Sequence, residues 1–309
     1  MKRILITGAN GFIGRFVAYR LLGWPVELHH LDIHPWNCQK SGYFFHQFNL
    51  LSSGAYAKNL ENLLKTIDPD ICLHLAWYTN PRDYLNARIN IEWRDASFEF
   101  AKTFARCGGK RFIAVGTCLE YGQVLTEFCD EEATPRLPET LYAQCKTELY
   151  DKLTEFFKKE QTEFAWPRIF FVYGPHDRPQ RLIGKVIDAL SRGVFFEPKN
   201  GGARRDYIYT NDLAEQLCAI LFSDLEGAIN CGSGHTVSIY EICRLIGEIM
   251  GKSNLIVENH QVTDYPVIQP SLKRLISIIP NFSVTPLDLG LKKSVDWFLY
   301  QGQDLVNER

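Results

Sequence analysis

The sequence predicts an α/β protein in which a doubly wound parallel sheet is followed by a smaller α+β unit. Two observations support this prediction. In the first half of the chain, short β-rich apolar runs alternate with stretches of helical periodicity, as in repeated βαβ units. After about residue 173 this alternation stops, and loops and helices follow. The 309 residues suffice for one large domain or two closely joined ones.

Six runs in the first half are predicted to be strands, because they are short, apolar and rich in β-formers. They are Arg3–Thr7, Val26–Asp32, Tyr43–Phe48, Ile71–Ala76, Arg111–Gly116 and Glu163–Val172. Helices are predicted between most of them, at Phe12–Leu22, Ala55–Ile67, Asp83–Cys107 and Leu141–Glu160. The largely apolar runs Ile4–Ile6 and Ile71–Leu75 are typical of strands that are buried on both faces.

The second half is predicted to hold four more helices, at Arg181–Arg192, Asn211–Phe222, Ser238–Met250 and Pro286–Tyr300. Ser238 and Glu241 form a capping-box pattern, and Thr285 precedes a proline at the first helical position. We therefore expect a first domain at residues 1–170, to which segments around 207–231 return. Residues 171–309 would form most of a second domain.

The composition excludes several classes of protein. The 34 basic and 36 acidic residues give a net charge of −2, which argues against nucleic-acid binding. Apolar runs fall far short of the roughly 20 residues that span a membrane, and the first residues do not resemble a signal peptide. Nine scattered cysteines without C-x-x-C spacing suggest neither a zinc site nor disulfides. We therefore expect a cytoplasmic protein with no bound metal.

A glycine-rich turn follows the first predicted strand and leads directly into a helix, at residues 7–14 (TGANGFIG). Gly8 permits a tight turn, Gly11 lets a pyrophosphate approach the backbone, and Gly14 lets the helix pack closely on the strand. The free N–H groups at the helix N-terminus favour phosphate. The turn therefore predicts a dinucleotide site, and a tight turn without a ligand is the alternative.

Asp32 ends the second predicted strand. An acid about 20 residues beyond the glycine turn can accept hydrogen bonds from the adenosine ribose, and it repels a 2′-phosphate. The next residues, 33–36, include no arginine. The sequence therefore favours NAD over NADP, and the alternative for Asp32 is a solvated loop acid.

Tyr142 and Lys146 are one turn apart on a predicted helix, so that both lie on one face. A nearby ammonium and an oxidised nicotinamide both lower the pKa of a tyrosine from its usual value near ~10. Such a tyrosine can pass a proton to or from a carbonyl oxygen while hydride moves at its carbon. Thr117, at the end of a predicted strand, can hold the same oxygen. A surface pair and a turn hydroxyl are the alternatives.

Together these motifs resemble the extended short-chain dehydrogenase/reductases of the NAD-dependent epimerase/dehydratase family, which act on nucleotide-diphosphate sugars. The resemblance covers residues 1 to about 250, where the family's motifs occur in order. They are the glycine turn, Asp32, Leu73–Ala76, Asn90, Gly116-Thr117 with Tyr121-Gly122, Tyr142-x-x-x-Lys146 and Tyr173–Pro175. The resemblance implies a Rossmann-like domain for the cofactor, a C-terminal domain for a sugar nucleotide, and a homodimer.

The resemblance also assigns residues. It implies a catalytic set of Thr117, Tyr142 and Lys146, with Asn90 in support. Arg205 would contact the substrate diphosphate. Arg181 could reach a phosphate, and a solvated arginine is its alternative. The residues expected to bind the cofactor are Gly8, Asn10, Gly11, Phe12, Ile13, Gly14, Asp32, Leu75, Ala76, Tyr142 and Lys146. Trp77 and Tyr78 are expected to border the nicotinamide, with a core position as the alternative for Trp77.

Departures from the family's pattern narrow the reaction. Family members that dehydrate C5–C6 have acids immediately after the threonine, where this chain has Cys118 and Leu119. Because elimination of water needs a positioned acid and base, a 4,6-dehydratase is disfavoured. Residues 116–123, with Leu125 and Glu127 beyond, are similar to 4-ketoreductases that form 6-deoxy sugars. Residues 170–172 lack an asparagine that often touches the substrate in the family.

Our leading hypothesis is an NAD(P)-dependent reductase of a nucleotide-linked 4-keto-6-deoxy sugar. A nucleotide-sugar 4-epimerase that uses the same residues is the first alternative. Asp32 slightly favours the epimerase, because many reductases prefer NADPH. A non-catalytic NAD-sensing regulatory protein is an alternative of another class, and the intact set of Thr117, Tyr142 and Lys146 argues against it.

Overall fold

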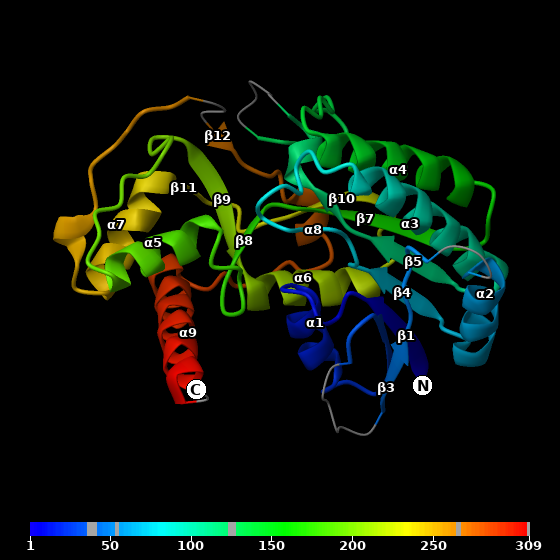
Figure 1. The fold of residues 1–309 in the computed structure, drawn as a ribbon. Coiled ribbons are helices and arrows are strands. Elements are labelled where there is room, and N and C mark those ends of the chain that lie inside the picture. The colour runs from blue at the N-terminus through cyan, green and yellow to red at the C-terminus, as the bar shows by residue number, and fades with distance from the viewer. Residues whose placement is uncertain (36–41, 53–55, 123–127, 264–266, 308–309) are drawn as a thin grey trace.

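The computed structural model describes residues 1–35, 42–52, 56–122, 128–263 and 267–307, which form two sheets with helices around them (Figure 1). The larger sheet has the strand order β10-β7-β5-β4-β1-β2-β3, and the short β6 pairs with β7. Its strands are β1 (Lys2–Thr7), β2 (Val26–Asp32), β3 (Tyr43–Gln47), β4 (Ile71–His74), β5 (Arg111–Ala114), β6 (Gly116–Thr117), β7 (Glu163–Ile169) and β10 (Gly227–Cys231). Its described pairs are all parallel, which confirms the predicted doubly wound parallel sheet.

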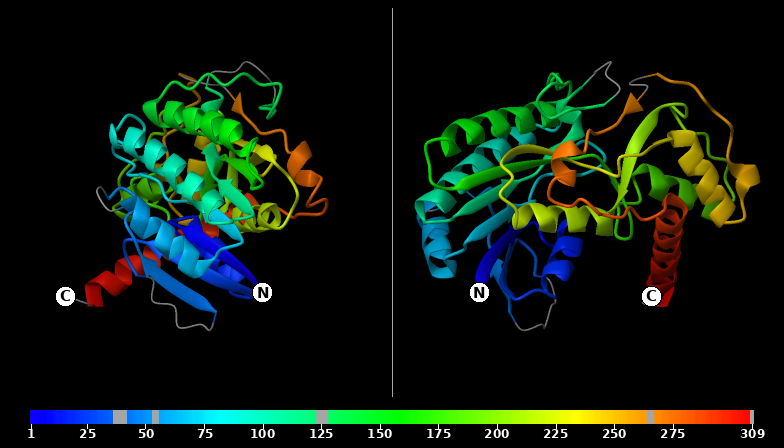
Figure 2. Two further views of the ribbon diagram at one scale, coloured as in Figure 1. Left: turned by 90° about the vertical axis from the view of Figure 1, so that its right-hand side faces the viewer. Right: turned by 180° about the vertical axis from the view of Figure 1, so that it is seen from behind.

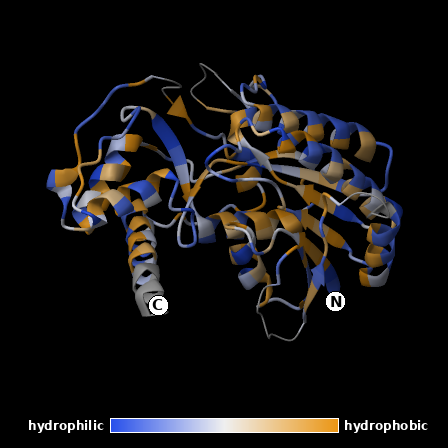
Figure 3. Cartoon of the chain, in the orientation of Figure 1, coloured by the Kyte–Doolittle hydropathy of each residue, from blue (hydrophilic) through white to orange (hydrophobic). Residues whose placement is uncertain are grey.

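Helices cover both faces of this sheet, and others pack on the second sheet described below. The α-helices in the described part of the chain are α1 (Gly14–Leu21), α2 (Tyr56–Ile67), α3 (Ile89–Arg106), α4 (Leu141–Phe157), α5 (Leu182–Ser191), α6 (Thr210–Leu221), α7 (Ile239–Ile249), α8 (Lys273–Ile276) and α9 (Leu287–Asn307). Ile4 and Ile6 of β1 pack on one side with α1, α6 and α8, whereas Leu5 packs on the other with α2, α3 and α4. Such alternation places both faces of β1 in the core. Figure 3 shows the hydrophobic residues concentrated between these layers.

The order of the strands creates a binding crevice. The chain passes from β1 to β2 and β3 on one side, and then returns to place β4 on the other side of β1. Loops that follow β1 and β4 therefore diverge at the carboxyl edge of the sheet. In open α/β sheets, ligands bind at such a switch point.

A second, smaller sheet lies beside the carboxyl edge of the first. It consists of β8 (Phe171–Tyr173), β9 (Arg204–Tyr209), β11 (Thr236–Ser238) and β12 (Val267–Ile268), and β9 pairs with each of the others. Helices α5, α7 and α9 pack together on it around a core of their own. Figure 2 shows α9 extending away from the rest of the molecule. Helix α6 and strand β10 belong to the layers of the larger sheet although they follow β9 in the chain.

Several element boundaries differ from the predictions. The predicted strand Glu163–Val172 is divided at Phe170, whose N–H donates to the Cys231 carbonyl oxygen, and the chain then enters the second sheet as β8. Helix α3 begins at Ile89 rather than Asp83, because residues 80–88 form successive turns. Helix α9 is longer than predicted. Strands β9, β10, β11 and β12 and helix α8 were not predicted.

Candidate active site

The glycine-rich turn joins β1 to α1 at the carboxyl edge of the larger sheet. Gly8 has a φ of +72°, and a Cβ there would lie 2.8 Å from the Ala76 nitrogen. A Cβ on Gly14 would lie 2.3 Å from the Gly8 carbonyl oxygen. Gly11 is exposed next to the N-terminus of α1. Side chains are thus excluded at two positions, while the open backbone at the helix start fits a phosphate.

Asp32 ends β2, and its carboxylate is held by local contacts. Its Oδ1 accepts a 2.7 Å hydrogen bond from the Ile33 N–H, and its Oδ2 lies 3.5 Å from His30 Nε2. Burial acts to raise the pKa of Asp32, but hydrogen bonds from His30 and the following backbone outweigh it and lower the pKa. Asn10 Nδ2 donates to the His34 carbonyl oxygen at 2.5 Å, which ties the glycine turn to this segment. An ionised acid here fits the ribose of NAD.

A buried polar chain links the carboxyl ends of β1 and β4. Thr7 Oγ1 lies 2.7 Å from His74 Nδ1 and accepts from the Ala76 N–H at 3.2 Å. His74 Nε2 lies 2.8 Å from Ser97 Oγ on α3. Burial is the largest cause that lowers the pKa of His74 to about 3, so the ring is neutral. These contacts hold Leu75 and Ala76 against the glycine turn.

Thr117, Tyr142 and Lys146 line one cavity of about 400 Å³. Thr117 ends β6, and Tyr142 lies in the first turn of α4, after the N-cap Thr140. Lys146 Nζ donates to the Val115 carbonyl oxygen at 2.9 Å and lies 6.0 Å from the Tyr142 ring centre. The structure therefore brings together the three residues that the sequence predicted to be catalytic. Ile13 and Leu75, expected at the cofactor, line the same cavity.

Burial dominates the electrostatics of these side chains. It raises the pKa of Tyr142, the nearby Tyr84 and Glu120 raise it further, and a hydrogen bond with Thr117 offsets this only partly. Burial also lowers the pKa of Lys146 to about 7, against the opposing effect of Glu120. The expected lowering of the Tyr142 pKa is therefore not produced by the protein's own groups. They hold Tyr142 as a neutral phenol, which is able to donate a proton.

A buried ion pair that the sequence analysis missed lies behind Thr117. Glu120 ends the short 3₁₀ helix η1 (Cys118–Glu120), and its Oε1 accepts from the Thr117 N–H at 2.9 Å and from Trp166 Nε1 at 3.0 Å. Its Oε2 accepts from Arg168 Nε at 2.9 Å, and both side chains are at most 1% exposed. The backbone of Thr117 is thereby fixed. The sequence held one indication of this pair: Glu120 and Arg168 each lie among mostly apolar neighbours.

Asn90, fully buried on α3, connects the loop after β4 to the site. Its Nδ2 donates to the carbonyl oxygens of Tyr84 at 2.7 Å and Ala87 at 2.8 Å. Its Oδ1 accepts from Trp77 Nε1 at 2.8 Å. Trp77 and Tyr84 both line the catalytic cavity.

The wall of the cavity toward the second sheet is mostly apolar. It includes Phe170, Phe171, Val172, Leu182, Ile183 and Tyr207. Arg181 also lines the cavity, and its Nε lies 3.6 Å from Asp177 Oδ1. Asp177 is the one acid among the described lining residues, and burial raises its pKa to about 6. Cys118 and Leu119 complete the wall beside Thr117.

Arg205 lies outside this lining. It is 4% exposed, its Nη1 donates to the Arg204 carbonyl oxygen at 2.9 Å, and its guanidinium lies 5.9 Å from the centre of the Phe171 ring. Arg205 is thus not among the described residues that line the cavity, and its expected contact with the substrate diphosphate stays a prediction. Leu125 and Glu127, part of the motif likened to 4-ketoreductases, lie outside the described residues.

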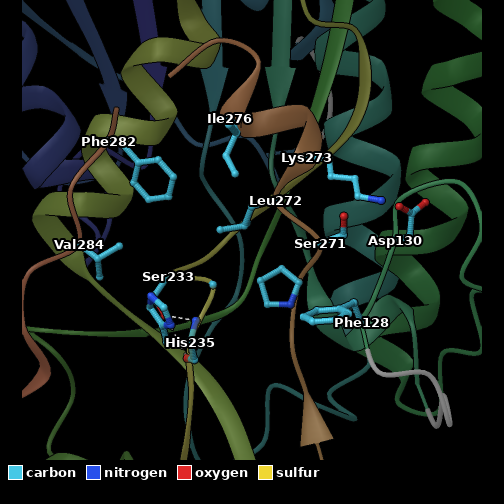
Figure 4. A pocket seen from close by; sticks show the side chains of 12 residues that line it. Phe128, Asp130, Ser233, His235, Ser271, Leu272, Lys273, Ile276, Phe282 and Val284 are labelled. Atoms are coloured by element: carbon cyan, nitrogen blue, oxygen red, sulfur yellow. Dashed lines mark hydrogen bonds between the residues drawn. The ribbon is translucent and has the colours of Figure 1, made fainter. Parts of the chain in front are cut away.

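A larger cavity of about 910 Å³ lies elsewhere, near α8 and the segment after β10 (Figure 4). Its lining includes Phe128, Asp130, Ser233, His235, Ser271, Leu272, Lys273, Ile276, Phe282 and Val284. No residue predicted for the site is among the described residues there. Within the described ranges, no group of three or more histidine, cysteine or acidic residues could hold a metal ion. No helix in the same ranges is long and apolar enough to cross a membrane.

Comparisons with known proteins find similar sequences and a similar fold over most of the chain. Mouse (Mus musculus) dTDP-D-glucose 4,6-dehydratase is 25% identical over 96% of this chain and 88% of its own. The dTDP-6-deoxy-L-talose 4-dehydrogenase (NAD(+)) of Aggregatibacter actinomycetemcomitans is 26% identical over 76% of this chain and 86% of its own. The solved structure of UDP-N-acetylglucosamine 4-epimerase from Methanobrevibacter ruminantium M1 has a TM-score of 0.86 at 22% identity, covering 97% of this chain and 99% of that one.

The model of the family described as "NAD dependent epimerase/dehydratase family" matches residues 4–232. This stretch runs from β1 through β10. It contains the glycine turn, Asp32, and the three residues Thr117, Tyr142 and Lys146 that line the catalytic cavity. The tight turn and the ionised Asp32 fit the NAD that this description names. The chain therefore belongs to the NAD-dependent epimerase/dehydratase family.

Proposed function

We propose that this protein is an NAD-dependent oxidoreductase that reduces the 4-keto group of a nucleotide-diphosphate 6-deoxy-hexulose. The observation that carries the proposal is the cavity wall beside Thr117, which is lined by Cys118 and Leu119. By the family resemblance, dehydratases have acids at these two positions. Elimination of water needs an acid and a base at the reacting carbons. The described acid in the lining, Asp177, is instead paired with Arg181.

The residues divide the reaction among them. When bound, the reduced cofactor supplies the hydride that the ketone carbon accepts. Tyr142 donates its phenolic proton to the ketone oxygen, so that the carbonyl becomes an alcohol and Tyr142 a phenolate. Lys146 stabilises that phenolate and holds the nicotinamide ribose, and Thr117 orients the oxygen that is protonated. A proton from solvent then restores Tyr142.

The same proposal assigns the binding residues. The glycine turn and Asp32 would bind the pyrophosphate and the adenosine ribose. We infer that residues 1–170, together with α6 and β10, bind NAD and that residues 171–309 mainly bind the sugar nucleotide. Arg181, at the start of α5, would contact the substrate diphosphate. A homodimer through α3 and α4 and a cytoplasmic location complete the proposal.

A nucleotide-sugar 4-epimerase is the second candidate, and Asp32 favours it. An acid at that position suits NAD, whereas many reductases use NADPH. Tyr142 would then take the proton of the C4 hydroxyl while bound NAD would accept the C4 hydride, and both would be returned after the ketone has rotated to present its opposite face. Asp177 and Arg181 are compatible with either reaction.

The absorbance of reduced nicotinamide distinguishes the candidates. We expect stoichiometric loss of added NADH with a nucleotide-linked 4-keto-6-deoxy sugar, because a reductase consumes one hydride per product. UDP- and dTDP-hexoses without a keto group serve as the control and should leave NADH unchanged. Interconversion of two such hexoses without added cofactor would instead establish the epimerase. NAD binding without turnover of any substrate would support a non-catalytic role.

A further inference from the structure

Lys146 is a buried cation with few polar partners. Its side chain ends in a protein interior that leaves the residue 3% exposed. An ammonium has three donors, and the described structure shows one in use, toward the Val115 carbonyl oxygen at 2.9 Å. Burial of an ammonium disfavours its charged form unless other groups compensate. An aromatic face beside Nζ can therefore add to the stabilisation that this one hydrogen bond gives the cation.

The face of Trp77 lies against this ammonium. Lys146 Nζ is 3.7 Å from the centre of the Trp77 ring, compared with 5.8 Å for Trp166 and 6.0 Å for Tyr142. A cation within about 6 Å of an aromatic face is attracted by the ring's quadrupole, most strongly by tryptophan. Trp77 is therefore the nearest aromatic face and the best placed to replace the water that burial removes.

The orientation of the Trp77 ring is itself determined. Its Nε1 donates to Asn90 Oδ1 at 2.8 Å, while Asn90 Nδ2 is held by two backbone carbonyl oxygens. The Trp93 ring packs beside it, with ring centres 6.2 Å apart. The edge of the indole is thus anchored on α3, and its face remains available to Lys146.

We propose that Trp77 is a positioning residue whose indole face holds the Lys146 ammonium in place and favours its charged form. The inference rests on the proposed function, because it gives Lys146 its role toward Tyr142 and the ribose. It also assigns a role to the buried Asn90, which acts on Lys146 through Trp77.

Other groups also face Lys146, and their effects differ. Glu120 of η1 and Cys145 of α4 favour its charge, whereas burial opposes it. His74 of β4 is neutral, and Tyr142 of α4 is a neutral phenol. Since the pKa of Lys146 is about 7, a modest loss of cation stabilisation changes its charge at neutral pH.

The test is a titration of Lys146 in the protein without substrate. Lysine labelled with ¹³C at Cε reports protonation by NMR, and the Lys146 signal is identified by its absence in Lys146→Ala. We expect the midpoint to fall by about one pH unit in Trp77→Met, which keeps an apolar chain without a π face. The midpoint in Trp77→Phe should lie between those of Trp77→Met and the wild type. Trp24→Phe is the matched control: Trp24 stacks on Phe222 and is not among the aromatic rings that face Lys146, so the midpoint should be unchanged.

NADH binding provides a second readout. Fluorescence titrations should show NADH binding weakening as the pH rises through the Lys146 midpoint, and this transition should lie about one pH unit lower in Trp77→Met than in the wild type. An unchanged midpoint in a folded Trp77 variant, or an equal shift in Trp24→Phe, would overturn the proposal. If Trp77→Met does not fold, Trp77→Phe decides by the same criteria. Neither measurement uses a sugar substrate, so the result is separate from the outcome of the reductase assay.

Discussion

Tyr142 is a neutral phenol in this protein because burial, with Tyr84 and Glu120, disfavours its anion. Four residues further on, Lys146 has a pKa of about 7 because burial disfavours its cation. In the proposed reduction, the enzyme must donate a proton first and stabilise a phenolate second. Tyr142 is therefore in the protonated state that ketone reduction requires at its start, whereas the charge of Lys146 at neutral pH depends on the groups around it.

Replacing Tyr142 by phenylalanine tests this assignment at the scale of one atom. The ring packing is retained and the proton donor is lost, so kcat should fall by roughly 10²- to 10⁴-fold. NADH affinity and the thermal unfolding temperature should remain close to those of the wild type. Tyr150→Phe is the matched control, because Tyr150 lies on the same helix and outside the described cavity lining. A folded, cofactor-saturated Tyr142→Phe with normal kcat would contradict the mechanism.

At the scale of elements, the unit formed by β1, the glycine turn and α1 combines close packing with an open backbone. Gly14 starts α1 so near the turn that a Cβ would lie 2.3 Å from the Gly8 carbonyl oxygen and 2.7 Å from the Ala9 Cα. Backbone atoms cannot move aside as a flexible side chain does. The distance between helix and strand therefore depends on the absence of a side chain at Gly14.

Gly14→Ala is accordingly expected to destabilise the protein by roughly 1–3 kcal/mol through overpacking. It should also weaken NADH binding, since the start of α1 must shift. Gly23→Ala, just beyond the same helix, is the matched control, because its added Cβ would meet the Arg20 carbonyl oxygen at an ordinary 3.5 Å. Urea unfolding and fluorescence titration of both variants check these outcomes. Equal stability of the two variants would show that the turn tolerates a side chain.

At the scale of the whole molecule, a buried polar network joins segments that are distant in the sequence. Arg168 Nη1 donates to Tyr121 Oη at 3.0 Å, and Tyr121 Oη donates to Asn230 Oδ1 at 2.7 Å. The Asn230 N–H donates to Glu131 Oε1 at 2.7 Å. With Glu120, these groups tie β7, β10 and η1 together behind Thr117. Removal of one member would leave a buried charge or dipole unpaired, which is costly.

Stability should depend on pH through buried histidine. His74 has a folded pKa of about 3, well below the usual 6.5, so from about pH 6.5 downward the unfolded chain binds a proton that the folded chain does not. The free energy of unfolding therefore falls as the pH falls. Asp177 and Asp206 have the opposite effect, because burial raises their pKa values from the usual ~4 to about 6 in the folded protein. Between these two pH values the folded chain binds more protons than the unfolded chain, so their contribution to the free energy of unfolding rises as the pH falls.

His74→Gln isolates the histidine contribution. Glutamine can still bond to Thr7 and Ser97 but does not titrate, so its disadvantage relative to the wild type should shrink as the pH falls. We expect the difference in unfolding free energy to decrease by roughly 1–2 kcal/mol between pH 8 and pH 5. Urea unfolding at several pH values measures it, and the aspartates cancel in the comparison. A difference that stays constant with pH would show that His74 is not buried as a neutral ring.

Much of the fold was predictable because its signals are local. Alternating apolar runs and helical stretches indicated the parallel sheet, and a glycine turn beside β1 indicated the dinucleotide site. The spacing of Tyr142 and Lys146 placed both on one helical face, and Thr117 preceded them at a strand end. Each of these inferences uses residues within about one element of one another, where covalent geometry and periodicity limit the possible arrangements.

The tertiary structure alone decided the contacts between distant residues. Glu120 pairs with Arg168 across 48 positions, and the Trp77 ring covers Lys146, which lies on a different element. The apolar run at residues 163–172 was one strand by its composition, yet it is shared between two sheets. The packing of the second sheet places the Arg205 guanidinium 5.9 Å from the centre of the Phe171 ring, a contact between residues 34 positions apart that no local pattern indicated. Such outcomes depend on how separate elements pack together, because the energy of a buried contact is determined by partners that no local pattern specifies.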